Sequence, residues 1–309
     1  MRSSTSSSEA GLLRALRLLL QAAAAPVATG ACLVALVTLL LPPGSSTHTI
    51  EDVIVETQLA RAARLPPARV LVVGDSSGLM GIDPVHLGND TESIAMIGFV
   101  GPRGLAGVLD RVKRSPGTLL VAMNPVSLSL SKAEMQPWEA RVHGSVREEP
   151  LARAREAMFS GVLARVVELP LPGAYGRSFG WPDDMARAID GGHGGLIDPS
   201  SMAACATPPR AISEAVRERL PELRVAIKRL APGRAYIVVT PSPSECAGAS
   251  FDDAHAAMLR ELGQELEIEP LHTRPTLPAA LFSTRAHLSA QGRASFTEEL
   301  AVTLAKRPE

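Results

Sequence analysis

One stretch of the chain, Arg69-Val-Leu-Val-Val-Gly-Asp-Ser-Ser-Gly78, constrains the fold more than any other. Its first half, 69–73, is a nearly continuous apolar run rich in β-branched residues, which is typical of a strand buried on both faces of a parallel sheet. The small residues that follow permit a sharp turn from strand to helix. Open α/β sheets bind ligands at the carboxyl ends of their strands, so Ser76 stands at a candidate functional position. The plain alternative is a loop that only turns the chain.

Further apolar runs of strand length alternate with stretches of helical spacing. We expect strands at 93–99, 118–123, 235–239 and 266–271, and helices at 49–64, 105–113, 150–169, 212–230, 251–266 and 293–306. This alternation predicts a three-layer α/β/α domain with a mostly parallel five-stranded sheet. The connection 126–233 is too long for a simple crossover. We expect it to be an insertion that forms a lid or substrate platform, or a decoration without a role in the site.

The segment 18–41 is apolar and uncharged. Its length suits a helix that crosses a bilayer, and Pro26 and Gly30 are tolerated in such helices. Arginines precede the segment and acidic residues follow it, so the positive-inside rule places the amino terminus in the cytoplasm. We therefore expect a single-pass protein of the cytoplasmic (inner) membrane with a periplasmic carboxyl-terminal domain. A cleaved signal peptide and a buried helix of a soluble esterase are the alternatives.

These features predict four parts. They are a cytoplasmic tail at 1–17, a transmembrane helix at 18–41, a linker with a short amphipathic helix at 42–64, and an α/β domain at 65–309. The insertion at 126–233 belongs to the last part, and Pro221 is expected to kink the helix predicted there.

Composition excludes some function classes. A formal net charge of −1 gives no reason to expect a nucleic-acid partner. The three cysteines, Cys32, Cys205 and Cys246, show no metal-ligand spacing, and we expect neither a metal nor a cofactor. Cys205 and Cys246 pair if the domain is exported. The simpler expectation, which we prefer, is that both are free buried thiols.

Polar and small residues follow the predicted strands in a recognisable order. Gly74-Asp75-Ser76 follows the first strand, Gly98 and Gly101 follow the second, Asn124 follows the third, and His287-Leu-Ser-Ala-Gln-Gly292 precedes the closing helix. In this order of motifs the chain resembles the SGNH (GDSL-type) hydrolase superfamily over 69–306, except for the long insertion. The resemblance implies a flavodoxin-like sheet.

The resemblance also implies a catalytic site. Ser76 would be the nucleophile and His287 its base. The oxyanion would be held by the N–H groups of Ser76 and Gly101, with Gly98 as the weaker candidate, and by the side-chain amide of Asn124. Gly74-x-Ser76-x-Gly78 also fits the α/β-hydrolase elbow, but in that fold several strands precede the serine.

The chain departs from the family pattern at one position. The acid expected three residues before His287 is replaced by Thr284. Loss of the corresponding acid costs serine proteases about 10⁴-fold in rate, so activity does not follow from the motifs alone. The hydroxyl of Thr284 or Ser283, or a backbone carbonyl, is the candidate orienter of the imidazole. Carboxylates from elsewhere in the chain are further candidates, namely Asp252, Asp253 and Glu269.

A single anchor followed by such a domain is similar to proteins linked to O-acetylation of exported polysaccharides or to D-alanine transfer. That resemblance implies a membrane-anchored serine acyl-esterase or O-acyltransferase that acts on acyl esters of a cell-envelope glycan. A membrane-bound acyltransferase is the implied protein partner. The alternative is a catalytically impaired SGNH-like domain that binds a glycan or that partner, and the substitution at Thr284 favours this alternative. His193, in the loop 191–195, is a further histidine that could reach the site.

Overall fold

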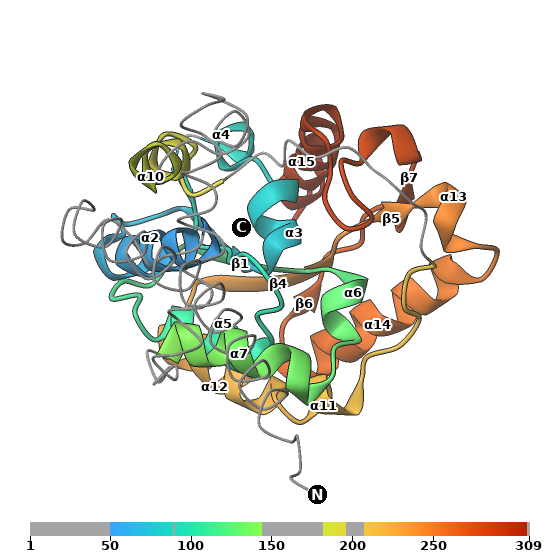
Figure 1. The fold of residues 1–309 in the computed structure, drawn as a ribbon, viewed down its shortest axis with the longest axis horizontal. Helices are drawn as coiled ribbons and strands as arrows, with labels where there is room; N and C mark the ends of the chain where they lie inside the picture. Colours follow the sequence, from blue (N-terminus) through green and yellow to red (C-terminus); the bar gives the residue numbers. More distant parts are fainter. Residues whose placement is uncertain (1–49, 89, 144–181, 196–206, 308–309) are drawn as a thin grey trace, which may run out of the picture.

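The computed structural model describes residues 50–88, 90–143, 182–195 and 207–307 (Figure 1). Its central sheet has five strands in the order β2-β1-β3-β4-β6, and every neighbouring pair is parallel. The strands are β1 (Val70–Gly74), β2 (Thr91–Ser93), β3 (Thr118–Met123), β4 (Arg234–Val239) and β6 (Glu269–Pro270). This is the order found in flavodoxin-like doubly wound sheets. The parallel α/β sheet predicted from the sequence is confirmed.

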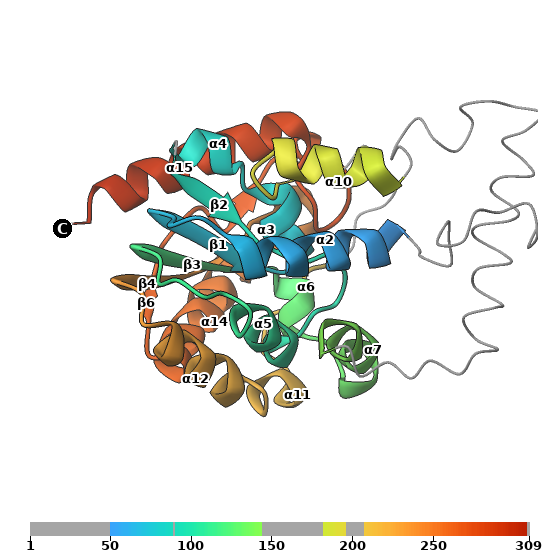
Figure 2. The ribbon, with the colours of Figure 1, turned by 90° about the vertical axis from the view of Figure 1, so that its left-hand side faces the viewer.

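Helices cover both faces of the sheet because alternate residues of its central strands point to opposite sides. Val73, Val121 and Ile237 belong to one hydrophobic core, which includes residues of α5 (Pro102–Leu109), α12 (Leu220–Leu230) and α14 (Phe251–Leu266). Val72, Leu120 and Val238 belong to the other, which includes residues of α15 (Ala290–Ala305). Figure 2 shows α15 and α4 (Pro84–Leu87) on one side of the sheet and α5, α12 and α14 on the other.

The outer edge of β2 is covered by the chain itself. The N–H of Ser93 donates to the carbonyl of His193 (2.8 Å), which follows α10 (Pro182–Gly191). Gly194 has a φ of +88°, and a Cβ there would lie 1.8 Å from the Ser93 carbonyl oxygen, so only glycine fits. An uncovered edge strand presents unpaired N–H and C=O groups that can pair with a strand of another molecule. The contact with the loop after α10 covers this part of the β2 edge.

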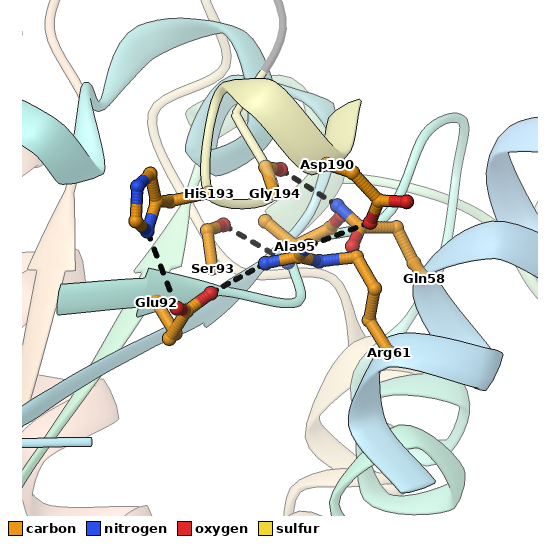
Figure 3. Close-up of polar contacts among 8 residues, drawn as sticks. All are labelled: Gln58, Arg61, Glu92, Ser93, Ala95, Asp190, His193 and Gly194. Carbon is orange, nitrogen blue, oxygen red and sulfur yellow. Dashed lines mark hydrogen bonds and ion pairs between the residues drawn. The ribbon is translucent and has the colours of Figure 1, made fainter. Parts of the chain in front are cut away.

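Polar side chains of α2 (Ile50–Arg64) hold α10 at this edge (Figure 3). The amide of Gln58 donates to the carbonyls of Ala95 (2.9 Å) and Gly194 (2.7 Å). The guanidinium of Arg61 pairs with Glu92 and with Asp190, at 2.7 Å from the latter. The helix expected at 49–64 therefore fixes part of the insertion to the sheet.

The insertion supplies α6 (Pro125–Leu128), α7 (Lys132–His143), α10, α11 (Glu214–Arg217) and α12. A buried ion pair between Glu139 of α7 and Arg219 (2.8 Å) joins α7 to the start of α12. The helix predicted at 212–230 is two helices, and Pro221 lies in the first turn of α12 instead of kinking it. A missing N–H has no cost at that position, because the first N–H groups of a helix lack intrahelical partners.

Two strands differ from expectation. β2 is only three residues long, although the chain beyond it continues along β1, since the N–H of Met96 donates to the Gly74 carbonyl (2.8 Å). The fifth strand, β6, has only two assigned residues and begins after α14, which extends to Leu266. Pro270 is tolerated at this sheet edge, because the next bond to β4 comes from the N–H of Leu271, which donates to the Ile237 carbonyl (2.8 Å). A small parallel sheet of β5 (Ser242–Pro243) and β7 (Thr276–Leu277), next to α13 (Ser244–Ala247), was not predicted.

Three expectations fall wholly outside the described ranges, namely the cytoplasmic tail at 1–17, the membrane-spanning segment 18–41 and the helix at 150–169. Within those ranges, no helix is both long enough and apolar enough to span a bilayer. Cys246 is disulfide-bonded, so the preferred expectation of a free thiol there is wrong. The other two cysteines, Cys32 and Cys205, are not among the described residues.

His255 of α14 is a buried histidine that contacts the last residue of β4. Its Nε2 lies 3.1 Å from the carbonyl oxygen of Val239, and its ring packs against Phe251 with centroids 5.9 Å apart. Burial lowers the pKa of His255, although the Val239 carbonyl and the charge of Asp252 act in the opposite direction. The unfolded chain therefore binds a proton at this residue at a higher pH than the folded chain does.

We expect the free energy of unfolding to fall as the pH drops below about 6.5, where the unfolded histidine takes up a proton that the folded one resists. His255→Gln retains an N–H donor but does not titrate. Urea denaturation at about pH 7.5 and about pH 5.5 should show a smaller loss of stability on acidification for the variant than for the wild type. Equal losses would show that His255 does not contribute to acid sensitivity.

Candidate active site

The turn after β1 depends on close backbone approach. A Cβ on Gly74 would lie 2.1 Å from the carbonyl oxygen of Ala122 in β3, so no side chain fits there. α3 (Ser76–Gly81) begins two residues later, with Asp75 as its N-cap. Ser76 is half-buried and is the first residue of the helix, so its N–H has no partner within the helix.

The carboxylate of Asp75 joins this turn to the neighbouring strand. Its Oδ1 accepts hydrogen bonds from the N–H of Ser77 (2.8 Å) and the Ser77 hydroxyl (2.6 Å), and its Oδ2 accepts one from the N–H of Asn124 (2.8 Å). Asp75 is fully buried. Buried charge is tolerated only where such partners are present, so Asp75 fixes the ends of β1 and β3 relative to each other.

The register of the sheet brings three polar side chains to one level. Gly74 is paired with Ala122, and Ala122 is paired with Val238. Two residues further along the three strands are Ser76, Asn124 and Thr240. The carboxyl ends of β1, β3 and β4 therefore present a hydroxyl, an amide and a second hydroxyl at the same rim.

A short loop before α15 carries the histidine to this rim. Phe282 and Leu288 form an antiparallel bridge that closes the loop, and the N–H of Ser283 donates to the carbonyl of His287 (2.9 Å). The Ser289 hydroxyl caps α15 by accepting from the N–H of Gly292 (3.3 Å). A Cβ on Gly292 would lie 2.0 Å from the Leu281 carbonyl oxygen, so the residues after the histidine include an apolar anchor, a cap and an obligatory glycine.

The structure brings Ser76 and His287 together although 211 positions separate them. The Oγ of Ser76 lies 2.9 Å from Nε2 of His287. Both side chains are half-buried. This distance lies within the range required of a base that takes a proton from a hydroxyl.

Thr284 acts on the backbone of this loop. Its Oγ1 accepts hydrogen bonds from the N–H groups of Ala286 (3.2 Å) and His287 (2.9 Å). A hydroxyl bound to backbone groups two and three residues ahead stabilises a turn. Thr284 therefore orients His287 through the main chain, and these contacts differ from the ring contact considered from the sequence.

Asn124 lies at the rim, and its carboxamide is held on both sides. Its Oδ1 accepts from the N–H of Val126 (2.8 Å), which caps α6. Its Nδ2 donates to the Thr240 hydroxyl (3.2 Å) and, more weakly, to the Ala286 carbonyl (3.4 Å). Asn124 thus connects β3, β4 and the histidine loop.

Gly98 and Gly101 lie in the chain that extends β2 past the end of β1. Gly98 has a φ of +81° and packs against the ring of Trp138, whereas Gly101 is the N-cap of α5 and lies against Met135. Within the described part of the chain, no hydrogen bond joins Gly101 to Ser76 or His287. Both glycines therefore lie past the carboxyl end of β1, as Ser76 does, without a hydrogen bond to the serine among the described residues.

The other candidate residues lie elsewhere. Glu269 pairs with Arg307 and is in register with Tyr236, near the amino end of β4, where an open cavity of about 410 Å³ also lies. Asp252 and Asp253 are exposed in the first turn of α14. His193 is held at the edge of β2 by Glu92, with 3.2 Å between Nδ1 and Oε1 (Figure 3). The possibility that His193 reaches the serine is therefore not realised in this structure.

Sequence reasoning missed two residues of the site. Asp75 was read as part of a motif, but its carboxylate holds the turn that carries Ser76. A buried acid between two small residues at a strand end was the available signal. Thr240 had no local signal, because its contact with Asn124 joins positions 116 residues apart.

Replacing Asp75 by Asn should destabilise the domain strongly. All three groups that face the carboxylate are donors in this arrangement, so an amide N–H would meet a donor. Loss of a buried, charge-assisted hydrogen bond costs about 1.5–3 kcal/mol, and a broken buried network costs more. Ser77→Ala, which removes one of the three donors, should cost less. Urea denaturation of both variants measures this order, and a stability of Asp75→Asn equal to that of the wild type would contradict it.

The chain matches no protein-family model, and no curated protein is significantly similar to it. The resemblance to SGNH hydrolases therefore rests on the motif residues and their arrangement. That arrangement is a serine hydroxyl at hydrogen-bond distance from an imidazole, at the start of a helix and the rim of a parallel sheet. Such a pair is suited to nucleophilic catalysis.

Proposed function

We propose that the chain is an extracytoplasmic serine acyl-esterase or O-acyltransferase of the SGNH type, anchored in the cytoplasmic membrane by its segment 18–41. Its substrates are acyl esters of a cell-envelope glycan, and the acyl group passes through Ser76. The observation that carries the proposal is the 2.9 Å distance between Ser76 Oγ and His287 Nε2.

The proposed reaction begins when Ser76 Oγ attacks the ester carbonyl carbon and His287 Nε2 takes the hydroxyl proton. Collapse of the tetrahedral intermediate breaks the bond to the alcohol, which receives the proton from His287. The resulting acyl-enzyme is attacked by water or a sugar hydroxyl, whose proton returns through His287 to Ser76. Water yields an esterase, and a sugar hydroxyl yields a transferase.

The negative oxygen of the intermediate needs donors at the rim. The N–H of Ser76, at the start of α3, is one candidate, and the Asn124 amide is another. The Gly101 N–H, or that of Gly98, is the third donor that the family resemblance implies. Removal of one such donor typically costs about 10² to 10³ in rate.

Export of the domain has support that is independent of the apolar segment. Disulfides persist in oxidising compartments and are rare in the cytoplasm, and Cys246 is disulfide-bonded. An ester-bearing envelope glycan is a substrate that is consistent with this location. A membrane-bound acyltransferase that supplies the acyl group fits it as the partner.

The second candidate function is a catalytically impaired domain that binds a glycan or the acyltransferase. Thr284 favours it, because its hydroxyl orients His287 through backbone contacts but supplies no negative charge to an imidazolium. A reactive serine separates the two candidates, since a binding module needs none.

Ser76→Ala should abolish hydrolysis of a short-chain aryl acetate by the full chain. Loss of a serine nucleophile lowers kcat by orders of magnitude, and we expect a loss of at least about 10³-fold. A fluorophosphonate probe should label the wild type but not this variant. Ser129→Ala, which removes another half-buried serine hydroxyl beyond the end of β3, should retain labelling. Unlabelled wild-type protein would favour the binding module, and hydrolysis that survives Ser76→Ala would remove Ser76 from the mechanism.

The anchor predicts a second result. The full chain should sediment with membranes, and a chain that lacks residues 1–41 should remain in the supernatant, since about 20 apolar residues suffice to span a bilayer. Protease added outside spheroplasts should digest the full-length protein, whereas a protected protein would place the domain in the cytoplasm.

A further inference from the structure

We propose that Thr240 is a positioning residue that holds the Asn124 carboxamide so that one N–H remains available to the reacting oxygen. The inference rests on the proposed acyl transfer. It adds the residue that directly follows β4 to a site whose motif residues follow β1 and β3 or lie in the histidine loop.

Of the three hydrogen bonds made by the Asn124 carboxamide, only the one to the Ala286 carbonyl is long enough to be exchanged easily. Its Oδ1 is committed to the Val126 N–H at 2.8 Å, which fixes the side of the amide on which Nδ2 lies. One hydrogen of Nδ2 is directed to Thr240 Oγ1 at 3.2 Å. The other is directed to the Ala286 carbonyl at 3.4 Å, near the outer limit of a hydrogen bond.

Thr240 can hold the amide because its own position is fixed. Its N–H donates to the Met123 carbonyl (2.9 Å), which extends the pairing of β4 with β3 by one residue. Thr240 as a whole is 2% exposed, so water does not compete readily for Oγ1. The threonine is therefore a rigid acceptor supplied by the strand next to Asn124.

The weak contact to Ala286 is the one that a substrate can replace. An oxyanion is a stronger acceptor than a peptide carbonyl. As negative charge develops, the second Nδ2–H would therefore exchange its hydrogen bond to the Ala286 carbonyl for one to the oxyanion of the intermediate. Thr240 retains the first hydrogen throughout and prevents the amide from turning away. Because Ala286 precedes His287, the same exchange would also release one contact of the histidine loop.

The test compares Thr240→Val, Thr240→Ser and Ser242→Ala in the full chain purified in detergent. Valine keeps the shape of threonine but cannot accept a hydrogen bond, and serine keeps the acceptor. Ser242 is also buried and lies two residues further along, so its variant is a control for loss of a hydroxyl. Steady-state hydrolysis of a short-chain aryl acetate gives kcat and KM for each protein, and thermal unfolding checks that each is folded.

We expect Thr240→Val to lower kcat by at least about tenfold, up to the 10² to 10³-fold loss that follows removal of an oxyanion donor. KM should change less than about twofold, since the amide acts on the intermediate and not on the bound ester. Thr240→Ser and Ser242→Ala should retain kcat. If Thr240→Val does not fold, Thr240→Ala replaces it with the same expectation.

An active wild type whose kcat survives the loss of the Thr240 hydroxyl would overturn this inference and leave the proposed function standing. An effect on KM alone would also overturn it, as would an equal loss of kcat in Thr240→Ser. A wild type that neither hydrolyses the ester nor reacts with a fluorophosphonate would refute the proposed function, and this inference with it.

Discussion

The carboxylate of Asp75 is fully buried and accepts hydrogen bonds from two groups of Ser77 and from the N–H of Asn124. One side chain thus satisfies donors at the start of α3 and at the end of β3. Without these donors a buried carboxylate would be strongly destabilising. Burial of Asp75 therefore requires that the start of α3 and the end of β3 lie next to each other. The position of Ser76 follows from this constraint, because it lies between Asp75 and Ser77.

The parallel register of β1, β3 and β4 then fixes the positions of the residues that follow these three strands relative to one another. The pairs Gly74–Ala122 and Ala122–Val238 place Ser76, Asn124 and Thr240 at one level, and the Asn124 amide reaches the loop that carries His287. The contacts therefore run from the paired strands to the loop that carries His287. In the proposed enzyme, positions set by the sheet would supply much of the preorganisation that acyl transfer needs.

Sequence periodicity predicted the elements whose packing is local. The runs at 69–73, 118–123 and 235–239 became central strands within one residue of the expected bounds, because buried β-branched runs between turns have few other solutions. Sequence periodicity predicted the two edge strands, β2 and β6, less accurately. β6 shortened to two residues, and the second strand was expected at 93–99 but is assigned at Thr91–Ser93. Edge strands have one partner, so their lengths depend on what covers them.

The amino-acid sequence by itself determined the α/β class of the domain and the identity of a serine, an amide and a histidine near strand ends. Only the tertiary structure decided that Ser76 and His287 are 2.9 Å apart, that Thr284 binds backbone groups, and that His193 belongs to the edge of β2. The physical reason is the separation along the sequence of the residues that interact. A strand or turn is favoured by residues a few positions apart, whereas a hydrogen bond between residues 211 positions apart exists only after the whole sheet has fixed both ends.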